Sequence, residues 1–153
     1  MMKTLIIMRH AHATNSGFND FERKLTPEGV SEAREAGEQL KRAGIVPDLI
    51  LSSSAVRAAE TAGNVATVLN LSDDKLIFDR TIYNCGGEGL LELIHQTSEE
   101  VKTLLLTGHN PAVSVLATIL TGNRHSMRPA EQIIIRSTAK SWQSFDEFIA
   151  YKE

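Results

Sequence analysis

Short apolar runs alternate with amphipathic segments along the whole chain. Runs typical of buried strands lie at residues 4–8, 47–53, 75–79 and 102–108. Apolar residues at helical spacing occur over 26–43, 56–69, 88–96 and from Pro111 to near Gly122. Further strands are predicted at 132–137 and 146–152. Because strands alternate with helices, the pattern predicts a three-layer α/β/α sandwich around a mainly parallel sheet.

The first predicted helix has clear signals at both ends. Thr26 suits the N-cap, Pro27 the first helical position and Gly44 the stop. The chain has 153 residues and contains no linker rich in Pro, Gly or Ser. We therefore expect a single domain spanning residues 1–153.

The composition narrows the functional classes. The net charge of −3, with both signs interspersed, argues against a nucleic-acid-binding protein, which needs a concentrated basic face. No apolar stretch approaches the roughly 20 residues of a transmembrane helix, so we expect no membrane partner. The lone Cys85 can form no internal disulfide and has no second cysteine for a zinc site. A cytoplasmic protein without metal or other cofactor is expected.

Polar side chains follow three of the predicted strands at the point where each strand ends. Arg9 and His10 follow the first strand, and Arg57 lies just beyond the serines 52–54 that end the second. His109 follows the strand at 102–108 and directly precedes a predicted helix. The carboxyl ends of parallel strands share one edge of a sheet, where ligands bind in α/β folds. The pattern therefore predicts that these arginines and histidines converge.

This set of residue types suits phosphate chemistry. Arginine offers paired donors that match phosphoryl oxygens, and a helix N-terminus also favours an anion. A histidine among such cations has a lowered pKa, which leaves its imidazole free to attack phosphorus at neutral pH. Phosphoryl transfer depends mainly on positioning and charge stabilisation, which these groups supply without a metal. The residues therefore indicate a phosphatase with a histidine nucleophile.

Each strand end also has a simpler interpretation. Arg9 and His10 could form a solvated strand end, and His109 could belong to an ordinary helix cap. Arg57 could pair with Glu60 on its own helix, a contact worth a few tenths of a kcal/mol. Their coincidence at one sheet edge favours a functional site over three unrelated features.

Four sequence motifs carry a resemblance to a known family. The stretches are "MRHAHA" at 8–13, "DFERKLTPEGVSEAREAG" at 20–37, "LILSSSAVRAAETA" at 49–62 and "LLLTGHNPAVSVLA" at 104–117. In this order and spacing they resemble the histidine phosphatase superfamily, whose members are phosphoglycerate mutase-like. The pattern is most similar to the small SixA-type phosphohistidine phosphatases. The resemblance implies the minimal form of this fold, without a large lid insertion.

The resemblance also implies roles for the matched residues. His10 would be the nucleophile, Arg9 and Arg57 would clamp the phosphoryl oxygens, and His109 would donate to them in the transition state. Further positions would contact phosphate or line the pocket: Arg23, Asn15 and Ser16. His12, two residues beyond the nucleophile, is expected at the pocket rim or in solvent.

The proton donor is the one role without a clear match. Larger members of the family carry an acid beyond the third strand, where this chain has Tyr-Asn-Cys at 83–85. Glu88 is the nearest acid in sequence and could equally serve the dipole of a helix N-terminus. Asp20 is a second candidate acid, or a loop residue near Arg23. A weak or missing acid fits a phosphohistidine substrate, whose imidazole leaves more readily than an alkoxide.

The predicted function is a metal-independent phosphatase acting on protein phosphohistidine. Between Asp79 and Lys102 the chain has room for only one short helix, so an open groove would admit a phosphorylated side chain of another protein. The alternative within the family is a phosphomonoesterase acting on a small phosphate ester. A non-catalytic phosphate-binding interaction module is the non-enzymatic alternative.

Overall fold

The computed structural model describes residues 2–15, 19–146 and 150–152, which form a six-stranded sheet in the order β3-β2-β4-β1-β5-β6. The four parallel strands are β1 (Lys3–Arg9), β2 (Leu49–Ser53), β3 (Leu76–Asp79) and β4 (Thr103–Gly108). Two antiparallel pairings extend the sheet through β5 (Gln132–Ser137) and β6 (Ala150–Lys152). The predicted mainly parallel sheet is confirmed, and β1 lies inside it.

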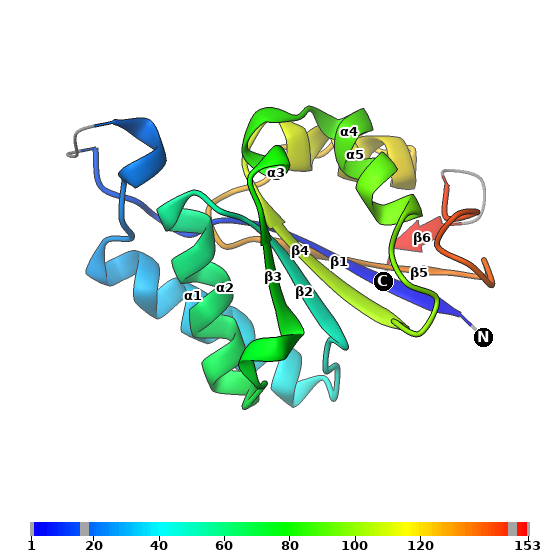
Figure 1. Ribbon diagram of the computed structural model, residues 1–153, viewed down its shortest axis with the longest axis horizontal. Helices are drawn as coiled ribbons and strands as arrows, with labels where there is room; N and C mark the ends of the chain where they lie inside the picture. Colours follow the sequence, from blue (N-terminus) through cyan, green and yellow to red (C-terminus); the bar gives the residue numbers. More distant parts are fainter. Residues whose placement is uncertain (1, 16–18, 147–149, 153) are drawn as a thin grey trace.

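Helices cover both faces of the sheet (Figure 1). One face carries α1 (Pro27–Arg42) and α2 (Val56–Leu69). The other face carries α3 (Thr81–Asn84), α4 (Gly87–His95) and α5 (Ala112–Thr121). Short 3-10 turns occur at Asp20–Glu22 and Asp73–Lys75. The three-layer α/β/α architecture is therefore confirmed.

The apolar run of β1 is buried on both sides. Leu5 and Ile7 belong to the apolar cluster beneath α4 and α5, whereas Ile6 and Met8 belong to the cluster beneath α1 and α2. All four side chains have no exposed surface. Burial on both faces explains why this strand is apolar at consecutive positions rather than at alternate ones.

The predicted boundaries of the first helix are confirmed. The Thr26 side chain accepts a hydrogen bond from the backbone N of Gly29 at 2.9 Å, and Pro27 opens the helix. Gly44 follows the helix with φ = 72°, a left-handed conformation that glycine adopts without strain.

Two segments differ from the prediction. Between Asp79 and Thr103 the chain forms two helices, α3 and α4, where one was expected. The helix α3 is a single turn whose only buried residue is Ile82, so it leaves no apolar periodicity to detect. The strand predicted at 146–152 spans Ala150–Lys152 in the structure, and residues 147–149 lie outside the described residues. Neither segment adds a long insertion over the sheet.

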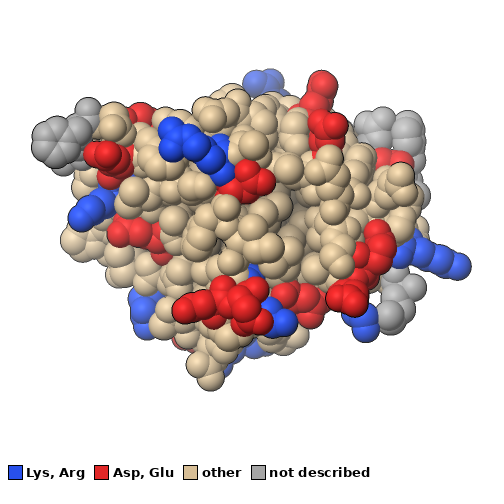
Figure 2. All heavy atoms as spheres, viewed as in Figure 1, with Lys and Arg blue, Asp and Glu red and all other residues tan. Residues whose placement is uncertain are grey.

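The surface carries charges of both signs. On the face shown in Figure 2, Lys and Arg side chains are interspersed with Asp and Glu and form no continuous basic patch. Within the described ranges, no helix has the length and apolar character needed to cross a membrane.

Gly29 marks a close approach between α1 and the segment that follows β1. A Cβ atom at this position would lie 2.1 Å from the carbonyl oxygen of His12. The same oxygen accepts a hydrogen bond from the backbone N of Thr26 at 3.0 Å. The first turn of α1 is therefore packed directly on the backbone two residues beyond His10.

We predict opposite effects for alanine at two helical glycines. Gly29→Ala forces the His12 backbone to move and lowers the free energy of unfolding by about 1 to 3 kcal/mol. Gly63→Ala, in α2 where no atom beyond the neighbouring helix backbone lies within 4 Å of the added Cβ, raises it by about 0.5 to 1 kcal/mol. Urea denaturation measures both changes. Equal stability of the two variants would contradict the close approach at Gly29.

Candidate active site

The pairing of β1 with β4 brings two histidines together. Arg9 lies opposite Gly108 in the parallel register, and the backbone N of His10 donates to the Gly108 carbonyl at 3.0 Å. The next residue on each strand is a histidine, and the ring centroids of His10 and His109 are 5.3 Å apart. The sheet itself therefore fixes the spacing of the two imidazoles.

The hydrogen bonds of His10 identify its free lone pair. Nδ1 lies 2.7 Å from the carbonyl oxygen of Ala11. A carbonyl oxygen can only accept, so Nδ1 is the donor and Nε2 carries the lone pair of the neutral ring. Nε2 accepts from Nε of Arg57 at 3.3 Å, and the residue is 8% exposed. The unprotonated nitrogen of His10 therefore faces an arginine.

Asp20 holds Arg57 and Arg23 in place. Arg57 donates through Nη1 to the Asp20 carbonyl oxygen at 2.6 Å and through Nη2 to Oδ2 at 2.9 Å. Tyr83 donates its hydroxyl to the same Oδ2 at 2.7 Å, and Arg23 donates to Oδ1 at 2.9 Å. Hydrogen bonds from Tyr83, Arg23 and Arg57 hold the pKa of Asp20 well below its ordinary value. Asp20 is therefore suited to stay ionised and hold the two arginines in place, rather than to donate a proton.

Backbone carbonyls orient the side chains of Arg9 and Arg23. Arg9 donates through Nη1 to the Met127 carbonyl at 3.1 Å, and its buried Nε has no partner among the described residues. Arg23 donates through Nε to the Thr14 carbonyl at 2.6 Å. Burial lowers the pKa of Arg9. Three guanidinium groups thus lie around His10.

One buried nitrogen of His109 has no hydrogen-bond partner among the residues that the structure describes. Its Nε2 lies 2.8 Å from Oγ of Ser53, at the end of β2. Ser53 Oγ also accepts from the backbone N of Ala55 at 3.1 Å, and its hydroxyl proton is available to donate to Nε2. We assign the imidazole proton on this basis to Nδ1, which is buried and unpartnered among the described residues. The site then contains a free N–H donor beside His10.

Both imidazoles are neutral at physiological pH. Burial lowers the pKa of His10 from 6.5 to about 4, an effect opposed by the Ala11 hydrogen bond and reinforced by Arg57 and Arg9. Burial also lowers the pKa of His109 to about 3, with further lowering by His10 and Arg57. Because the positive charge comes from arginines, the histidine lone pair stays available.

The structure separates the predicted site residues into two groups. It brings together Arg9, His10, Arg23, Arg57, His109 and Asp20. Asn15 and Glu88 are both exposed, and Glu88 lies in the first turn of α4. Ser16 lies outside the described residues.

Two residues of the site were missed from the sequence. Thr61 accepts from the backbone N of Ala11 at 3.0 Å and donates to the Arg57 carbonyl at 2.7 Å, so it ties β1 to α2. Its signal was a threonine on the buried stripe of α2, four residues after Arg57. Tyr83 begins the Tyr-Asn-Cys stretch at 83–85, and its contact with Asp20 had no sequence signal.

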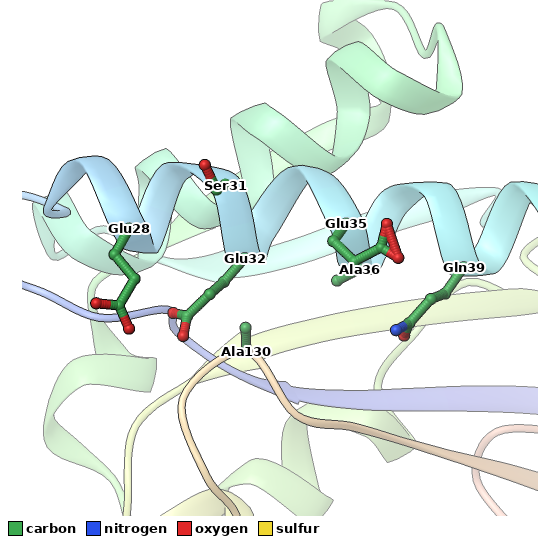
Figure 3. Close-up of a pocket in the computed structure, with 7 residues that line it drawn as sticks. All are labelled: Glu28, Ser31, Glu32, Glu35, Ala36, Gln39 and Ala130. Atoms are coloured by element: carbon green, nitrogen blue, oxygen red, sulfur yellow. The ribbon is translucent and has the colours of Figure 1, made fainter.

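A second polar cluster lies near the site formed by His10, His109 and the arginines. Ligand atoms of His12, Glu28 and Glu32 are within 4.8 Å of one another, as a metal would require. Glu32 already accepts from the His12 backbone N at 3.0 Å and from Nδ1 at 2.7 Å. Figure 3 shows Glu28 and Glu32 reaching from α1 toward the segment that carries Ala130, across a groove of about 480 Å³. Carboxylates repel phosphate, so this groove is unsuited to a phosphoryl group.

Comparison with known proteins assigns the chain to a family. The model of the histidine phosphatase superfamily (branch 1) matches residues 5–80. The phosphohistidine phosphatase SixA of Escherichia coli is 31% identical over 118 residues, which cover 76% of this chain and 73% of that protein.

Solved structures show the same fold. A protein histidine phosphatase SixA in complex with tungstate superposes with a TM-score of 0.78 at 27% identity, over 98% of this chain and 94% of the other. A protein from Nakamurella multipartitia, provisionally described as SixA, gives a TM-score of 0.82 at 23% identity, over 100% and 94% of the two chains. The chain therefore belongs to the histidine phosphatase superfamily and is a phosphatase.

Proposed function

We propose that the protein is a metal-independent phosphatase that removes phosphate from phosphohistidine on a protein substrate, through a phosphorylated His10. The observation that carries this proposal is the neutral His10, whose Nε2 lone pair lies 3.3 Å from Nε of Arg57. The likeness to proteins named as phosphohistidine phosphatases supports the substrate class.

In the first step, the Nε2 lone pair of His10 attacks phosphorus and the P–N bond of the substrate breaks. The electron pair of that bond goes to the leaving ring nitrogen. A substrate ring that carries a proton on its other nitrogen departs as neutral imidazole, so this step requires no further proton. Arg9, Arg57 and the Nδ1–H of His109 stabilise the charge on the phosphoryl oxygens.

In the second step, water attacks the phosphorus of phosphorylated His10. The electron pair of the P–Nε2 bond returns to His10, and the proton lost by water passes to solvent. Inorganic phosphate is released. The proton of Nδ1 stays on that nitrogen throughout, hydrogen-bonded to the Ala11 carbonyl, so His10 returns to its starting tautomer.

The acids of the site favour phosphohistidine over a phosphate ester. An alkoxide leaving group needs a proton donor. Asp20 accepts hydrogen bonds from Tyr83, Arg23 and Arg57, and Glu88 is exposed on α4. The short segment between Asp79 and Thr103 also leaves space over the site for a side chain of another protein. A phosphomonoesterase is the alternative within the same family, and a neutral His10 argues against a module that only binds phosphate.

We predict that His10→Ala abolishes turnover of a phosphohistidine-carrying protein. The loss of kcat is about 10³-fold or more, because no other group replaces the nucleophile. Wild-type enzyme quenched with base during turnover retains radiolabelled phosphate, and His10→Ala does not. The measurement is release of labelled phosphate, run beside a panel of phosphate esters.

His12→Ala is the matched control, since it removes a histidine two residues away whose side chain pairs with Glu32. It keeps activity within about twofold of wild type, as expected for an exposed substitution. Turnover that survives His10→Ala would overturn the nucleophile assignment. Faster hydrolysis of esters than of phosphohistidine would favour the phosphomonoesterase.

Removal of divalent metals is predicted to leave the activity unchanged. Arg57, Arg9 and Arg23 lie near enough to His10 to lower its pKa, and they supply the positive charge that a metal provides in other phosphatases. Phosphohistidine turnover is measured before and after dialysis against EDTA. A loss of activity that added Mg²⁺ or Zn²⁺ restores would contradict the metal-independent mechanism.

The low pKa of His10 makes stability depend on pH. An unfolded histidine titrates near 6.5 and folded His10 near 4, so the unfolded state binds more protons between these values. Stability is therefore lost as the pH falls through this window. Between pH 7 and pH 5, wild type loses about 1 to 2 kcal/mol more than His10→Gln does. Urea denaturation measures this difference, and parallel pH profiles of the two proteins would contradict the neutral buried state.

A further inference from the structure

A small cavity adjoins the phosphate site next to His109. It has a volume of about 170 Å³ and lies between α3, the start of α4 and the start of α5. His109 and Tyr83 line it, whereas Arg9, His10 and Arg57 do not. The cavity therefore adjoins the phosphate site without overlapping it.

The walls of this cavity are uncharged. Its floor contains Ile82 and Ala112, which are 1% and 7% exposed, and Val115 stands at its rim with 43% exposure. Burial raises the pKa of the Cys85 thiol, which keeps this lining group neutral. Among the described residues that line the cavity, there is no Asp, Glu, Lys or Arg. Apolar walls with few polar groups favour a weakly polar ligand.

Two of the polar side chains in the wall already bond within the protein: Tyr83 donates its hydroxyl to Asp20, and the amide of Asn110 is paired through both of its polar atoms. Asn110 donates through Nδ2 to the Met127 carbonyl at 2.9 Å, and its Oδ1 accepts from the Ser114 hydroxyl. A ligand with several hydroxyl groups would find little here to replace its hydrogen bonds to water.

The size of the cavity matches one planar ring. A cavity of roughly 150 Å³ with apolar walls holds a benzene molecule. The walls are also fixed, because a Cβ on Gly87 would lie 2.6 Å from Cγ1 of Val115 and 3.0 Å from the backbone N of Leu116. The start of α4 is thus packed directly against α5, which leaves little freedom for the cavity to widen.

We propose that this cavity is the leaving-group subsite and that it binds the imidazole ring of a phosphorylated histidine side chain. The proposal rests on the proposed function and adds the basis of its selectivity. In an in-line displacement the leaving group lies across phosphorus from the nucleophile. The cavity is lined by His109 and not by His10, so a ring held in it stays apart from the nucleophile, as this arrangement needs. Leaving groups that carry hydroxyl or carboxylate groups are disfavoured by its neutral, apolar walls.

The test is to fill the cavity from its rim. Val115→Phe places a ring where the leaving group would bind, at an exposed position outside the catalytic residues. The assay compares phosphoimidazole with phosphoramidate, which has the same P–N bond but releases ammonia in place of a ring. We expect kcat/KM for phosphoimidazole to fall about tenfold or more, since pocket contacts of this size discriminate by such factors. For phosphoramidate it stays within about twofold.

Two further variants keep the test specific. Val46→Phe introduces the same side chain at a 54% exposed residue before the amino end of β2, away from the cavity. It leaves kcat/KM unchanged for both substrates. Val115→Met intrudes less into the cavity. It lowers kcat/KM for phosphoimidazole by a smaller factor than Val115→Phe does, and it again leaves the value for phosphoramidate within about twofold. Equal losses for both substrates, or no loss for phosphoimidazole, would overturn the subsite.

Phosphate esters separate this proposal from the proposed function. If wild type hydrolyses neither P–N substrate but cleaves esters, the proposed function fails. The ratio of phenyl phosphate to methyl phosphate then tests the cavity alone. A fall in this ratio in Val115→Phe supports a ring-binding subsite, and an unchanged ratio rejects it.

Discussion

The parallel pairing of β1 with β4 is the constraint on which the site depends. The pairing places Arg9 opposite Gly108, so His10 and His109 leave the sheet side by side. The register is strongly fixed because Leu5 and Ile7 are buried beneath one helical layer, whereas Ile6 and Met8 are buried beneath the other. A slip of one residue would exchange these two sets of side chains between the faces. Core packing thus sets the distance between the two imidazoles.

The second layer of the site is electrostatic and depends on Asp20. Its carboxylate and carbonyl groups engage Nη1 and Nη2 of Arg57, while Nε of the same guanidinium donates to His10. A phosphoryl group that binds Arg57 must therefore share these donors with Asp20. The ionised carboxylate also offsets part of the charge of Arg57 and Arg23. Asp20 therefore lowers the net positive charge that an anion would meet beside His10.

The local parts of this arrangement could be predicted from the sequence, and the long-range parts could not. Apolar periodicity and capping residues predicted β1 and α1, and the three strand ends pointed to His10, Arg57 and His109. Periodicity carries no signal for a contact between side chains far apart in the chain, such as Asp20 with Tyr83. The helical pair of Arg57 with Glu60 was an incorrect alternative. Glu60 accepts from the backbone N of Leu25 at 2.8 Å instead.

The neutral state of the two histidines bears on why the proposed reaction needs no proton donor. Burial keeps His10 neutral, and the hydrogen bond to the Ala11 carbonyl keeps its proton on Nδ1. Transfer of a phosphoryl group from one imidazole to another exchanges two bonds of the same kind, so the first step is close to balanced in free energy. Neither ring needs an external acid, because each carries a proton on its second nitrogen. An ester would form the same intermediate only by expelling an alkoxide, whose high basicity makes the step unfavourable without a proton donor. Under the proposed function, selectivity for phosphohistidine arises partly because the site provides no acid for an ester, and partly from the contacts that the site makes.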